Sequence, residues 1–416
     1  MRRLWSVVVA CLVFAVTLIP VSGEVKSTKC EIFSWWTVGG EATGLKALFD
    51  EYNKANPKVE IINATVGTGA GTTAKAVLVS RMMGGDPPDA FQVHGGQELI
   101  DTWVKVGKMT QVTSLWKSEG WEKVYPKGIR DLVTYQGQYY AVPVGIHRCN
   151  VLWYNKKVFA KYGQKVPVTM ADFFKVAEAF KAKGIIPLAL GSRMGYELGM
   201  TFETILAGQL GANAYNGLWT GKTKWSDPRV AKSLELFKRM LSYVNSDHVA
   251  LSWDAAIDYV IKEKAAMIIQ GDWVNGWIKA KKLSDFDYGW AASPGTVGIF
   301  EPANDTFGVP KGAPHPDAAL EWLRTVGSKK AQEVFAYNKG CIPARVDADL
   351  SNFDDYLKWS QKEWSSNKIV PSCVHGSAAK ESWATEYKDA INIFAANLDV
   401  QATQKALVQA AEKALR

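Results

Sequence analysis

Histidine and cysteine are scarce in this chain. It has 416 residues, of which only five are histidine and five are cysteine. No two histidines stand four residues apart, His-Glu-x-x-His is missing, and the cysteines lack metal-ligand spacing, so a metalloenzyme is not expected. A Gly-x-Ser-x-Gly sequence and a phosphate-binding loop are missing as well. We therefore predict that the protein uses neither a metal nor a cofactor.

Long apolar stretches are missing except at the beginning of the chain. Arg2 and Arg3 precede an apolar run over residues 4–19, and small residues follow up to Gly23. This pattern is typical of a secretory leader, so we predict a signal peptide over residues 1–23 and a periplasmic location. The alternative is an uncleaved membrane anchor, which the short length of the run disfavours. No later stretch is long and apolar enough to span a bilayer.

A concentration of positive charge is missing too. The formal net charge is +8, but basic residues are mixed with acidic ones, as between Lys279 and Asp287. Because no basic stripe would follow a phosphate backbone, nucleic acid is not an expected partner. The chain is longer than one hydrophobic core normally supports, which predicts two domains or more.

Strand and helix patterns alternate after the leader. Apolar periodicity predicts strands at 30–36, 59–62 and 89–94, with helices between them that end near residues 56 and 84. A further strand is expected at 185–190, and helices are expected at 172–183, 253–263, 317–326, 328–338 and the C-terminus. This order favours a mostly parallel sheet with helices on both faces.

Two adjacent indoles stand near the mature N-terminus. Trp35 and Trp36 end the first predicted strand. Gln92 and His94 end the third, and ligands of open parallel sheets bind beyond such strand ends. A sugar offers a face of C–H groups edged by hydroxyls, which suits flat rings with a few polar groups around them. Together with Glu41, these side chains predict a cleft that binds a sugar.

Several segments carry a resemblance to a known family. They are Phe33–Trp36 with Glu41, Gly85–His94, Val142–Arg148, Leu152–Asn155, Gly271–Trp273 and Asn304–Pro310. With them the chain resembles the substrate-binding proteins of bacterial ABC sugar importers, specifically the glucose/galactose-binding group within the larger maltose-binding-like class. The resemblance covers essentially the whole mature chain. It implies a binding protein, not an enzyme, that delivers a sugar to a membrane permease.

The resemblance also implies an α/β, two-lobed periplasmic binding protein fold of the type II-like class. Hinge segments would cross between the lobes, and the ligand cleft would lie between them. The N-terminal lobe is expected at 24–138 and 297–341, the C-terminal lobe at 142–294 and 345–416, and the hinges near 139–146, 295–306 and 341–345. These hinges agree with extended segments rich in proline and glycine at 138–145, 292–295 and 306–312.

The resemblance further implies which residues touch the sugar. Trp35, Trp36 and Trp253 are expected to stack on it, with Trp273 as the competing aromatic residue of the second lobe. Hydrogen bonds are expected from Glu41, Gln92, His94, Asp305, Lys339 and His375. In a fully regular strand only one of Trp35 and Trp36 would face the cleft, and the other would be core. A capping or surface role for Glu41 and a packing role for Trp253 are the competing interpretations of these two residues.

The cysteines beyond the leader are Cys30, Cys149, Cys341 and Cys373. An oxidising compartment permits disulfides, and four cysteines allow three full pairings. Lys339 and His375, both expected at the site, stand beside Cys341 and Cys373, so we predict a bridge between these two. The alternative is that the thiols are free and buried. For Arg148 at the hinge, we expect a bracing contact with a carboxylate rather than a place in the cleft.

Three further functions remain open on the sequence alone. A secreted glycoside hydrolase would use Glu41 and Asp305 as an acid and base pair. A binding protein for a short oligosaccharide and a sugar-sensing adaptor for a membrane receptor would share the fold and the pocket. The favoured prediction is a monomeric periplasmic binding protein of an ABC sugar importer. Its expected ligand is a monosaccharide, with glucose first and galactose as the alternative, and its expected partner is a membrane-embedded permease.

Overall fold

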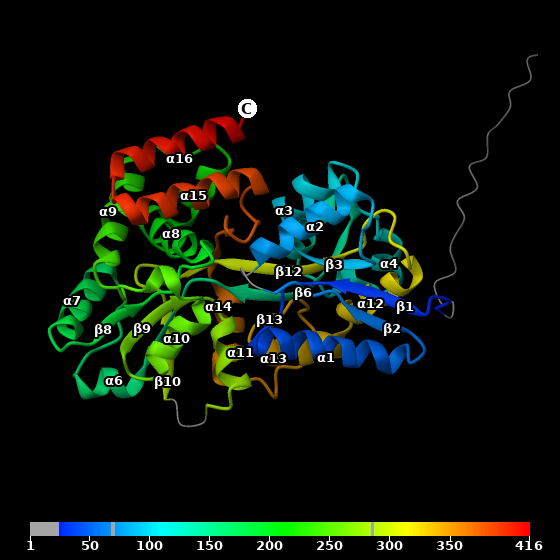
Figure 1. Ribbon diagram of the computed structural model, residues 1–416, viewed down its shortest axis with the longest axis horizontal. Coiled ribbons are helices and arrows are strands. Elements are labelled where there is room, and N and C mark those ends of the chain that lie inside the picture. The colour runs from blue at the N-terminus through cyan, green and yellow to red at the C-terminus, as the bar shows by residue number, and fades with distance from the viewer. Residues whose placement is uncertain (1–24, 68–70, 284–286) are drawn as a thin grey trace, which may run out of the picture.

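The protein consists of two lobes, each built around its own main sheet (Figure 1). The computed structural model describes residues 25–67, 71–283 and 287–416. The predicted signal peptide lies outside the described residues. Within them, no helix combines the length and the apolar character that crossing a membrane requires. The arrangement confirms the prediction of an α/β fold with two lobes.

The first lobe contains a six-stranded sheet in the order β13-β6-β12-β3-β1-β2. Its strands are β1 (Lys29–Phe33), β2 (Glu60–Asn63), β3 (Ala90–His94), β6 (Ala141–Arg148), β12 (Pro302–Gly308) and β13 (Ile342–Pro343). Strands β2, β1 and β3 are parallel, whereas β12, β6 and β13 join antiparallel. The prediction of a mostly parallel sheet is therefore wrong here, because β12 returns from the second lobe between β3 and β6.

Helices cover both faces of this sheet. On one face lie α1 (Gly39–Ala55), α12 (Pro316–Gly327) and α13 (Lys329–Lys339), and on the other lie α2 (Thr72–Gly84) and α3 (Gln97–Leu99) (Figure 1). The buried face of α1 carries Leu45, Leu48 and Tyr52, which confirms the apolar pattern. The lobe is completed by a π-helical turn (Ile100–Val104), α4 (Thr113–Ser118), a 3₁₀ turn (Trp121–Lys123), α5 (Lys127–Asp131), β4 (Thr134–Tyr135) and β5 (Gln138–Tyr139).

The second lobe contains a four-stranded sheet in the order β10-β7-β9-β8. Its strands are β7 (Val151–Asn155), β8 (Ile186–Ala189), β9 (Ala265–Gln270) and β10 (Tyr288–Ala292). Strand β8 is parallel to β9, and β7 is antiparallel to both of its neighbours. A small parallel pair, β11 (Ile299–Phe300) and β14 (Lys368–Ile369), lies apart from this sheet.

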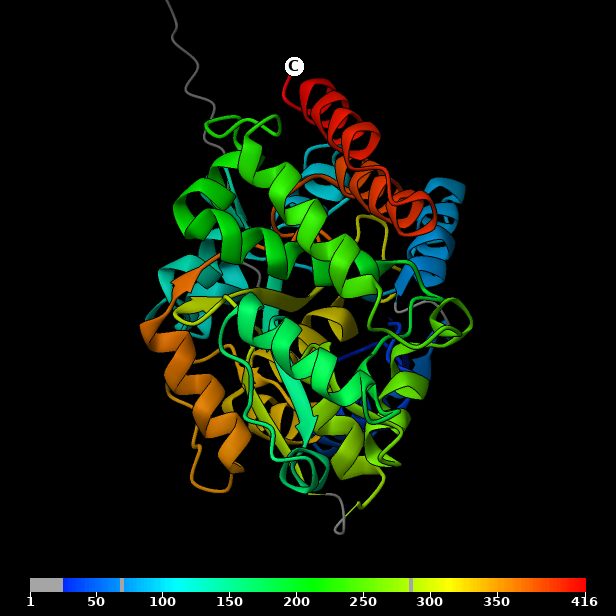
Figure 2. The same ribbon diagram turned by 90° about the vertical axis from the view of Figure 1, so that its left-hand side faces the viewer.

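Most helices of the protein belong to the second lobe. They are α6 (Lys156–Lys161), α7 (Met170–Lys181), α8 (Tyr196–Trp219), α9 (Pro228–Leu241), a 3₁₀ turn (His248–Ala250), α10 (Trp253–Ile261), α11 (Trp273–Ala280), α14 (Asp355–Ser366), α15 (Glu381–Asn397) and α16 (Val400–Ala414). Figure 2 views the molecule from this side, with α15 and α16 packed together at the top. Thr169 begins α7 with a capping box to Asp172, which explains why the helix starts there.

Two crossing segments lie side by side between the lobes. The first leads from β6 into β7, and the second leads from β10 to β12. Asn150 joins them, because its side-chain amide donates to Oγ1 of Thr296 and to the carbonyl oxygen of Ile299, both at 3.0 Å. Strand β6 stays in the first sheet up to Arg148, so the predicted start of the second lobe at residue 142 is too early. The other lobe boundaries remain predictions.

Arg148 braces this crossing, which confirms its predicted role. Its side chain is fully buried, and Nη1 lies 3.2 Å from Oε2 of Glu363 on α14. The guanidinium also lies 4.3 Å from the ring centroid of Trp359, and its Nη2 donates to the carbonyl oxygen of Ile299. The charge is therefore paired and stacked within the protein rather than turned toward the cleft.

The four cysteines of the described chain are buried free thiols, so the predicted bridge between Cys341 and Cys373 is wrong. The two cysteines are held by different lobes. Cys341 precedes β13, and its Sγ packs so closely on β6 that a Cβ atom at Gly145 would meet it at 2.7 Å. The main-chain N–H of Cys373 donates to Glu203 on α8.

Glycines let the backbones of the two lobes touch where α11 meets α1 and α13. A Cβ atom at Gly40 would lie 2.6 Å from the carbonyl oxygen of Asn338 and from Cα of Gly276. A Cβ atom at Gly276 would lie 2.3 Å from the carbonyl oxygen of Lys339. These positions therefore require glycine. The contact fixes the neighbouring Glu41 and Lys339 at the boundary between the lobes.

Candidate binding site

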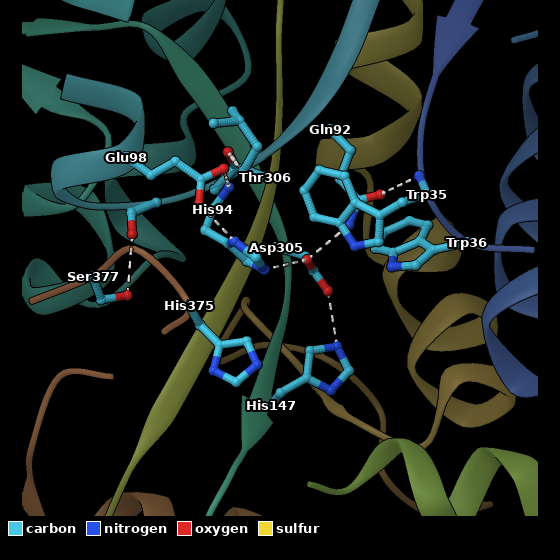
Figure 3. A network of polar contacts seen from close by, with 12 residues as sticks. Trp35, Trp36, Gln92, His94, Glu98, His147, Asp305, Thr306, His375 and Ser377 are labelled. Atoms are coloured by element: carbon cyan, nitrogen blue, oxygen red, sulfur yellow. Dashed lines mark hydrogen bonds and ion pairs between the residues drawn. The ribbon is translucent and has the colours of Figure 1, made fainter. Parts of the chain in front are cut away.

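A cavity of about 530 Å³ opens between the two lobes. Both lobes contribute to its walls. Eight of the nine residues predicted to bind a sugar line it, namely Trp35, Trp36, Glu41, His94, Trp253, Asp305, Lys339 and His375. The fold thus gathers residues from widely separated segments. Figure 3 shows the polar contacts around five of the eight, namely Trp35, Trp36, His94, Asp305 and His375.

Trp35 and Trp36 both line the cavity. Strand β1 ends at Phe33, so the alternation of a regular strand no longer applies to the two tryptophans. The ring centroid of Trp35 lies 5.1 Å from that of His94. Trp36 also reaches the core, with its ring centroid 4.9 Å from that of Phe335. The structure therefore does not divide Trp35 and Trp36 into one cleft residue and one core residue.

Aromatic side chains of the second lobe complete the walls. Trp253 begins α10, Trp273 begins α11 and Tyr196 begins α8, and all three line the cavity. The ring centroids of Trp253 and Trp273 lie 6.5 Å apart, and those of Trp273 and His375 lie 5.6 Å apart. Both second-lobe tryptophans considered from the sequence are thus present, whereas Tyr196 was missed.

Asp305 on β12 is the centre of the polar network (Figure 3). Its Oδ1 accepts a hydrogen bond from Nε2 of Gln92 at 3.0 Å and lies 3.8 Å from Nε2 of His94. Its Oδ2 lies 2.8 Å from Nε2 of His147. Burial alone would raise the pKa of Asp305, but the hydrogen bond and charge of His147, with the charge of Lys339, lower it well below the usual range. Asp305 is therefore an ionised acceptor.

Gln92 does not line the cavity, so its predicted role as a direct sugar ligand needs correction. Its Oε1 accepts a hydrogen bond from the Ser34 hydroxyl at 2.7 Å and one from the main-chain N–H of Trp35 at 3.3 Å. Its amide nitrogen donates to Asp305. The side chain is fully buried and fixes Trp35 and Asp305 in place. Strand alternation correctly put Gln92 and His94 on one face, but only His94 reaches the cavity.

His147 on β6 joins carboxylates from both lobes. Its Nδ1 contacts Oδ1 of Asp272, which immediately precedes α11, while its Nε2 faces Asp305. Burial and the charge of Lys339 would lower the pKa of His147, but Asp272 raises it well above the usual value. The imidazolium form is therefore favoured. His147 stands in one of the segments that carry the family resemblance, but the sequence predicts no role for it.

Lys339 and Glu41 form a second charged pair in the cavity. Nζ of Lys339, at the end of α13, lies 3.2 Å from Oε1 of Glu41 in the first turn of α1. The ammonium group lies 5.8 Å from the ring centroids of both Trp36 and Trp273. Burial would lower the pKa of Lys339, but Glu41 and Asp305 raise it above the usual value. The cavity therefore holds a permanent cation between tryptophans of the two lobes.

His375 is held in one tautomer by the loop between β14 and α15. The Ser372 hydroxyl donates to Oε2 of Glu203 at 2.8 Å, so it accepts the Nδ1–H of His375 at 2.9 Å. Burial and then the charge of His94 lower the pKa of His375 well below the usual value. The neutral ring consequently offers Nε2 as a hydrogen-bond acceptor.

The partly exposed side of the cavity was not predicted. It is formed by side chains of α2 and α15, which we call the rim: Lys75, Val79, Glu381, Lys388 and Asn392. Their local sequences look like ordinary solvated helix faces. Only the fold brings α2 and α15 to one cavity, so no local signal marks these residues.

Residues 37–333 match the family described as bacterial extracellular solute-binding protein. The chain belongs to this family. The matched segment contains most of the cavity-lining residues of the first lobe, with Trp253 and Trp273 of the second. The broader part of the sequence resemblance is thereby confirmed. Membership of a glucose/galactose-binding group remains a prediction.

Relatives of known sequence and structure support the same assignment. The solute-binding protein is 40% identical to an uncharacterized ABC transporter extracellular-binding protein of Pyrococcus horikoshii, over 92% of this chain and 88% of the relative. It is 31% identical to a probable sugar-binding periplasmic protein of Rhizobium meliloti, over 84% of each chain. The solved structure of AcbH, a bacterial solute receptor with an exclusive preference for β-D-galactopyranose, matches at a TM-score of 0.82 and 20% identity. That match covers 93% of this chain and 99% of AcbH, and it confirms the two-lobed solute-binding fold.

Members of this family are solute-binding proteins and not enzymes, which confirms the prediction of a non-enzymatic protein. The two carboxylates that a hydrolase would use have partners within the protein. Glu41 pairs with Lys339, and Asp305 is shared by Gln92 and His147. Within residues 25–67, 71–283 and 287–416, no group of three or more histidine, cysteine or acidic side chains is arranged to hold a metal ion.

Proposed function

We propose that this solute-binding protein takes up one monosaccharide in the interlobe cavity and delivers it to the membrane permease of an ABC importer from the periplasm. Glucose is the expected ligand, and galactose is the alternative. The observation that carries the proposal is the meeting of aromatic planes and charged hydrogen-bonding groups from both lobes in one cavity of about 530 Å³.

The chemistry of the cavity fits a neutral sugar ring. Trp35 and Trp253 offer flat apolar surface for the C–H faces of the ring from opposite lobes. Asp305 accepts hydrogen bonds from hydroxyls, Lys339 donates them, and Nε2 of His375 accepts one more. Each charged hydrogen bond in such a desolvated place contributes about 1.5 to 3 kcal/mol. The names of the Rhizobium meliloti relative and of AcbH further support a carbohydrate ligand.

Delivery follows from the two-lobed construction. A sugar that touches Trp35 and Asp305 of one lobe and Trp253 and His375 of the other makes its full set of contacts only when the lobes are closed. Binding therefore shifts the population toward the closed form. A permease that recognises the closed form would then receive loaded protein in preference to empty protein.

A short oligosaccharide is the second candidate, and the rim favours it. The cavity continues past the tryptophans to Lys75 and Val79 of α2 and to Lys388 and Asn392 of α15. These side chains would be within reach of a second ring attached to the first.

Calorimetric titration with glucose, galactose, mannose, xylose and maltose tests both candidates. We expect saturable binding of one monosaccharide at a ratio of one per chain. Tighter binding of maltose than of any monosaccharide would favour the second candidate. If none of the five sugars binds, the proposal fails, and turnover of an aryl glycoside by the purified protein would replace it with an enzymatic function.

A further inference from the structure

Charged residues of the two lobes meet at the rim. Lys75 lies on α2 of the first lobe, and Glu381 is the first residue of α15 in the second. Nζ of Lys75 lies 3.6 Å from Oε2 of Glu381. The two side chains are 21% and 31% exposed, so water and salt reach this pair.

Each member of the pair also has a partner within its own lobe. Nζ of Lys75 lies 2.6 Å from Oε2 of Glu98, which follows β3. Oε1 of Glu381 lies 3.3 Å from Nζ of Lys388 on the same helix. Separation of the lobes would therefore break the contact between Lys75 and Glu381 without leaving either charge alone. A contact of this kind is reversible, as a protein that must release its ligand requires.

The first-lobe half of the pair is connected to the site. Oε2 of Glu98 lies 2.9 Å from Nδ1 of His94, which lines the cavity. The ammonium group of Lys75 lies 5.9 Å from the ring centroid of Trp35. The main-chain N–H of Glu98 donates to the carbonyl oxygen of Gly376, next to His375. Glu98 thus touches the rim pair, a first-lobe site residue and the loop that carries a second-lobe site residue.

We propose that Lys75 and Glu381 form a latch across the rim, which favours the closed form and is coupled through Glu98 to the position of His94. The latch rests on the proposed function in one respect, namely that the closed form retains a sugar. Lys75 and Glu381 act as positioning residues: they set how long the cavity stays closed, while the tryptophans and Asp305 hold the ligand.

Because the proposed ligand is a neutral sugar, the salt dependence of its affinity can report on the latch. The ligand carries no charge, so salt dependence of its affinity must come from charges of the protein. The pair of Asp305 with His147 is buried, and the side chains of Lys339 and Glu41 are 2% and 17% exposed. The latch side chains are more exposed, at 21% and 31%, so salt screens them more strongly. Raising the ionic strength from about 0.02 M to about 0.5 M should weaken sugar binding about two- to fivefold, mainly through faster release.

Variants of Glu381 test the latch without touching the first-lobe site. Glu381→Gln should weaken binding by about the same factor and remove most of the salt dependence, and Glu381→Lys should weaken it further. Glu386→Gln is the matched control, because Glu386 lies on the same helix and pairs with Lys413 of α16 within the second lobe. This control should bind with the wild-type affinity, release rate and salt dependence.

A ligand-free measurement separates the latch from direct sugar contact. The four cysteines of the described chain are buried, so cysteines introduced at Met83 on α2 and Ile393 on α15 would take dyes selectively. These positions are 71% and 60% exposed and lie on the two latch helices. Energy transfer should report a larger distance between the two dyes in Glu381→Lys than in the parent. High salt should increase this distance in the parent toward the value in Glu381→Lys.

The outcomes are distinct. The latch is overturned if Glu381→Gln keeps the wild-type release rate and salt dependence, or if Glu386→Gln changes them equally. It is also overturned if the distance between the dyes changes neither with salt nor in Glu381→Lys. If the wild-type protein binds no sugar at all, the proposed function fails, and the ligand-free separation alone decides the latch.

Discussion

Oδ2 of Asp305 lies 2.8 Å from Nε2 of His147, and the other ring nitrogen of this histidine contacts Asp272. The two residues come together because β12 and β6 pair antiparallel, with Gly145 opposite Asp305 and His147 opposite Ala303. A histidine between two carboxylates is stabilised as imidazolium, and the imidazolium in turn keeps Asp305 ionised. The charge state of the cavity is therefore set by backbone pairing at the hinge side of the first lobe.

Asp305→Asn tests this relationship. The pKa of His147 should fall, because one of its two carboxylates is gone, while Asp272 still holds the ring. An NMR titration of the His147 ring should show the shift, and Asp50→Asn on the exposed surface of α1 should leave the ring unchanged. Sugar affinity should drop about 10- to 100-fold, which corresponds to one charged hydrogen bond. An unchanged pKa of His147 would contradict the assignment.

Trp35→Ala and Trp36→Ala should differ in what they damage. Both rings line the cavity, but Trp36 also packs against Phe335 and Phe307, with ring centroids 4.9 and 5.7 Å away. Loss of Trp36 should therefore cost about 3 to 5 kcal/mol of unfolding free energy and also weaken binding. Trp35→Ala should weaken binding by a few kcal/mol at a smaller cost in stability.

Urea unfolding and glucose titration of both tryptophan variants provide the comparison. Each variant serves as the control for the other. Equal losses of stability would show that Trp35 is as much a core residue as Trp36. Unchanged sugar titrations in both variants would remove the stacking surface from the proposed function.

Local periodicity predicted the elements of the first lobe well, because it reports which residues of a segment are buried. It does not report strand direction, so the antiparallel entry of β12 between β3 and β6 was not visible in the sequence. The same limit applies to Gln92. Its spacing from His94 identifies a shared strand face, but the neighbours that occupy its amide come from β12 and from the loop after β1.

Two residues that line the same cavity need not have sequence neighbours that lie close together. Lys339 and His375 both line the cavity, but they reach it from different lobes. The cysteines beside them are buried free thiols held by different lobes, so the predicted bridge fails. Lys75 and Glu381 illustrate the converse, because residues far apart in sequence form a contact that no local pattern indicates.

Two buried carboxyl groups beneath the loop of His375 should respond differently to the same substitution. Glu203 of α8 accepts hydrogen bonds from the Ser372 hydroxyl and from the main-chain N–H groups of Cys373 and Val374. Burial and the charge of Glu203 raise the pKa of Glu301 well above the usual value, which favours the neutral form of Glu301.

Glu301→Gln should therefore be tolerated, because an amide replaces a neutral acid of similar shape, with a cost below about 1 kcal/mol. Glu203→Gln removes one acceptor oxygen and the charge, which should cost about 1.5 to 3 kcal/mol and loosen the loop that positions His375. Urea unfolding and sugar titration should show a loss of both stability and affinity in Glu203→Gln alone. Equal behaviour of the two variants would contradict this division of roles.

Glu197 should make the free energy of unfolding depend on pH. It is the second residue of α8 and fully buried, and burial raises its pKa to about 8, although its own main-chain N–H and the charge of Arg193 oppose the shift. In the unfolded chain a glutamate titrates near pH 4.3. Between about pH 4.3 and about pH 8 the folded protein therefore keeps a proton that the unfolded chain releases.

Stability contributed by that proton is fully present below about pH 4.3, is lost progressively as the pH rises, and levels off above about pH 8. Glu197→Gln should flatten the curve and be more stable than wild type at about pH 8, by a few kcal/mol at most. Urea unfolding, followed by tryptophan fluorescence at about pH 5, 6, 7 and 8, measures both proteins. Other acids such as Glu301 affect wild type and Glu197→Gln alike, so the difference between their unfolding free energies isolates the contribution of Glu197. The control Glu60→Gln, on the exposed strand β2, should show the same pH dependence as wild type. A constant difference across this range would show that Glu197 is ionised in the folded protein and would contradict the raised pKa.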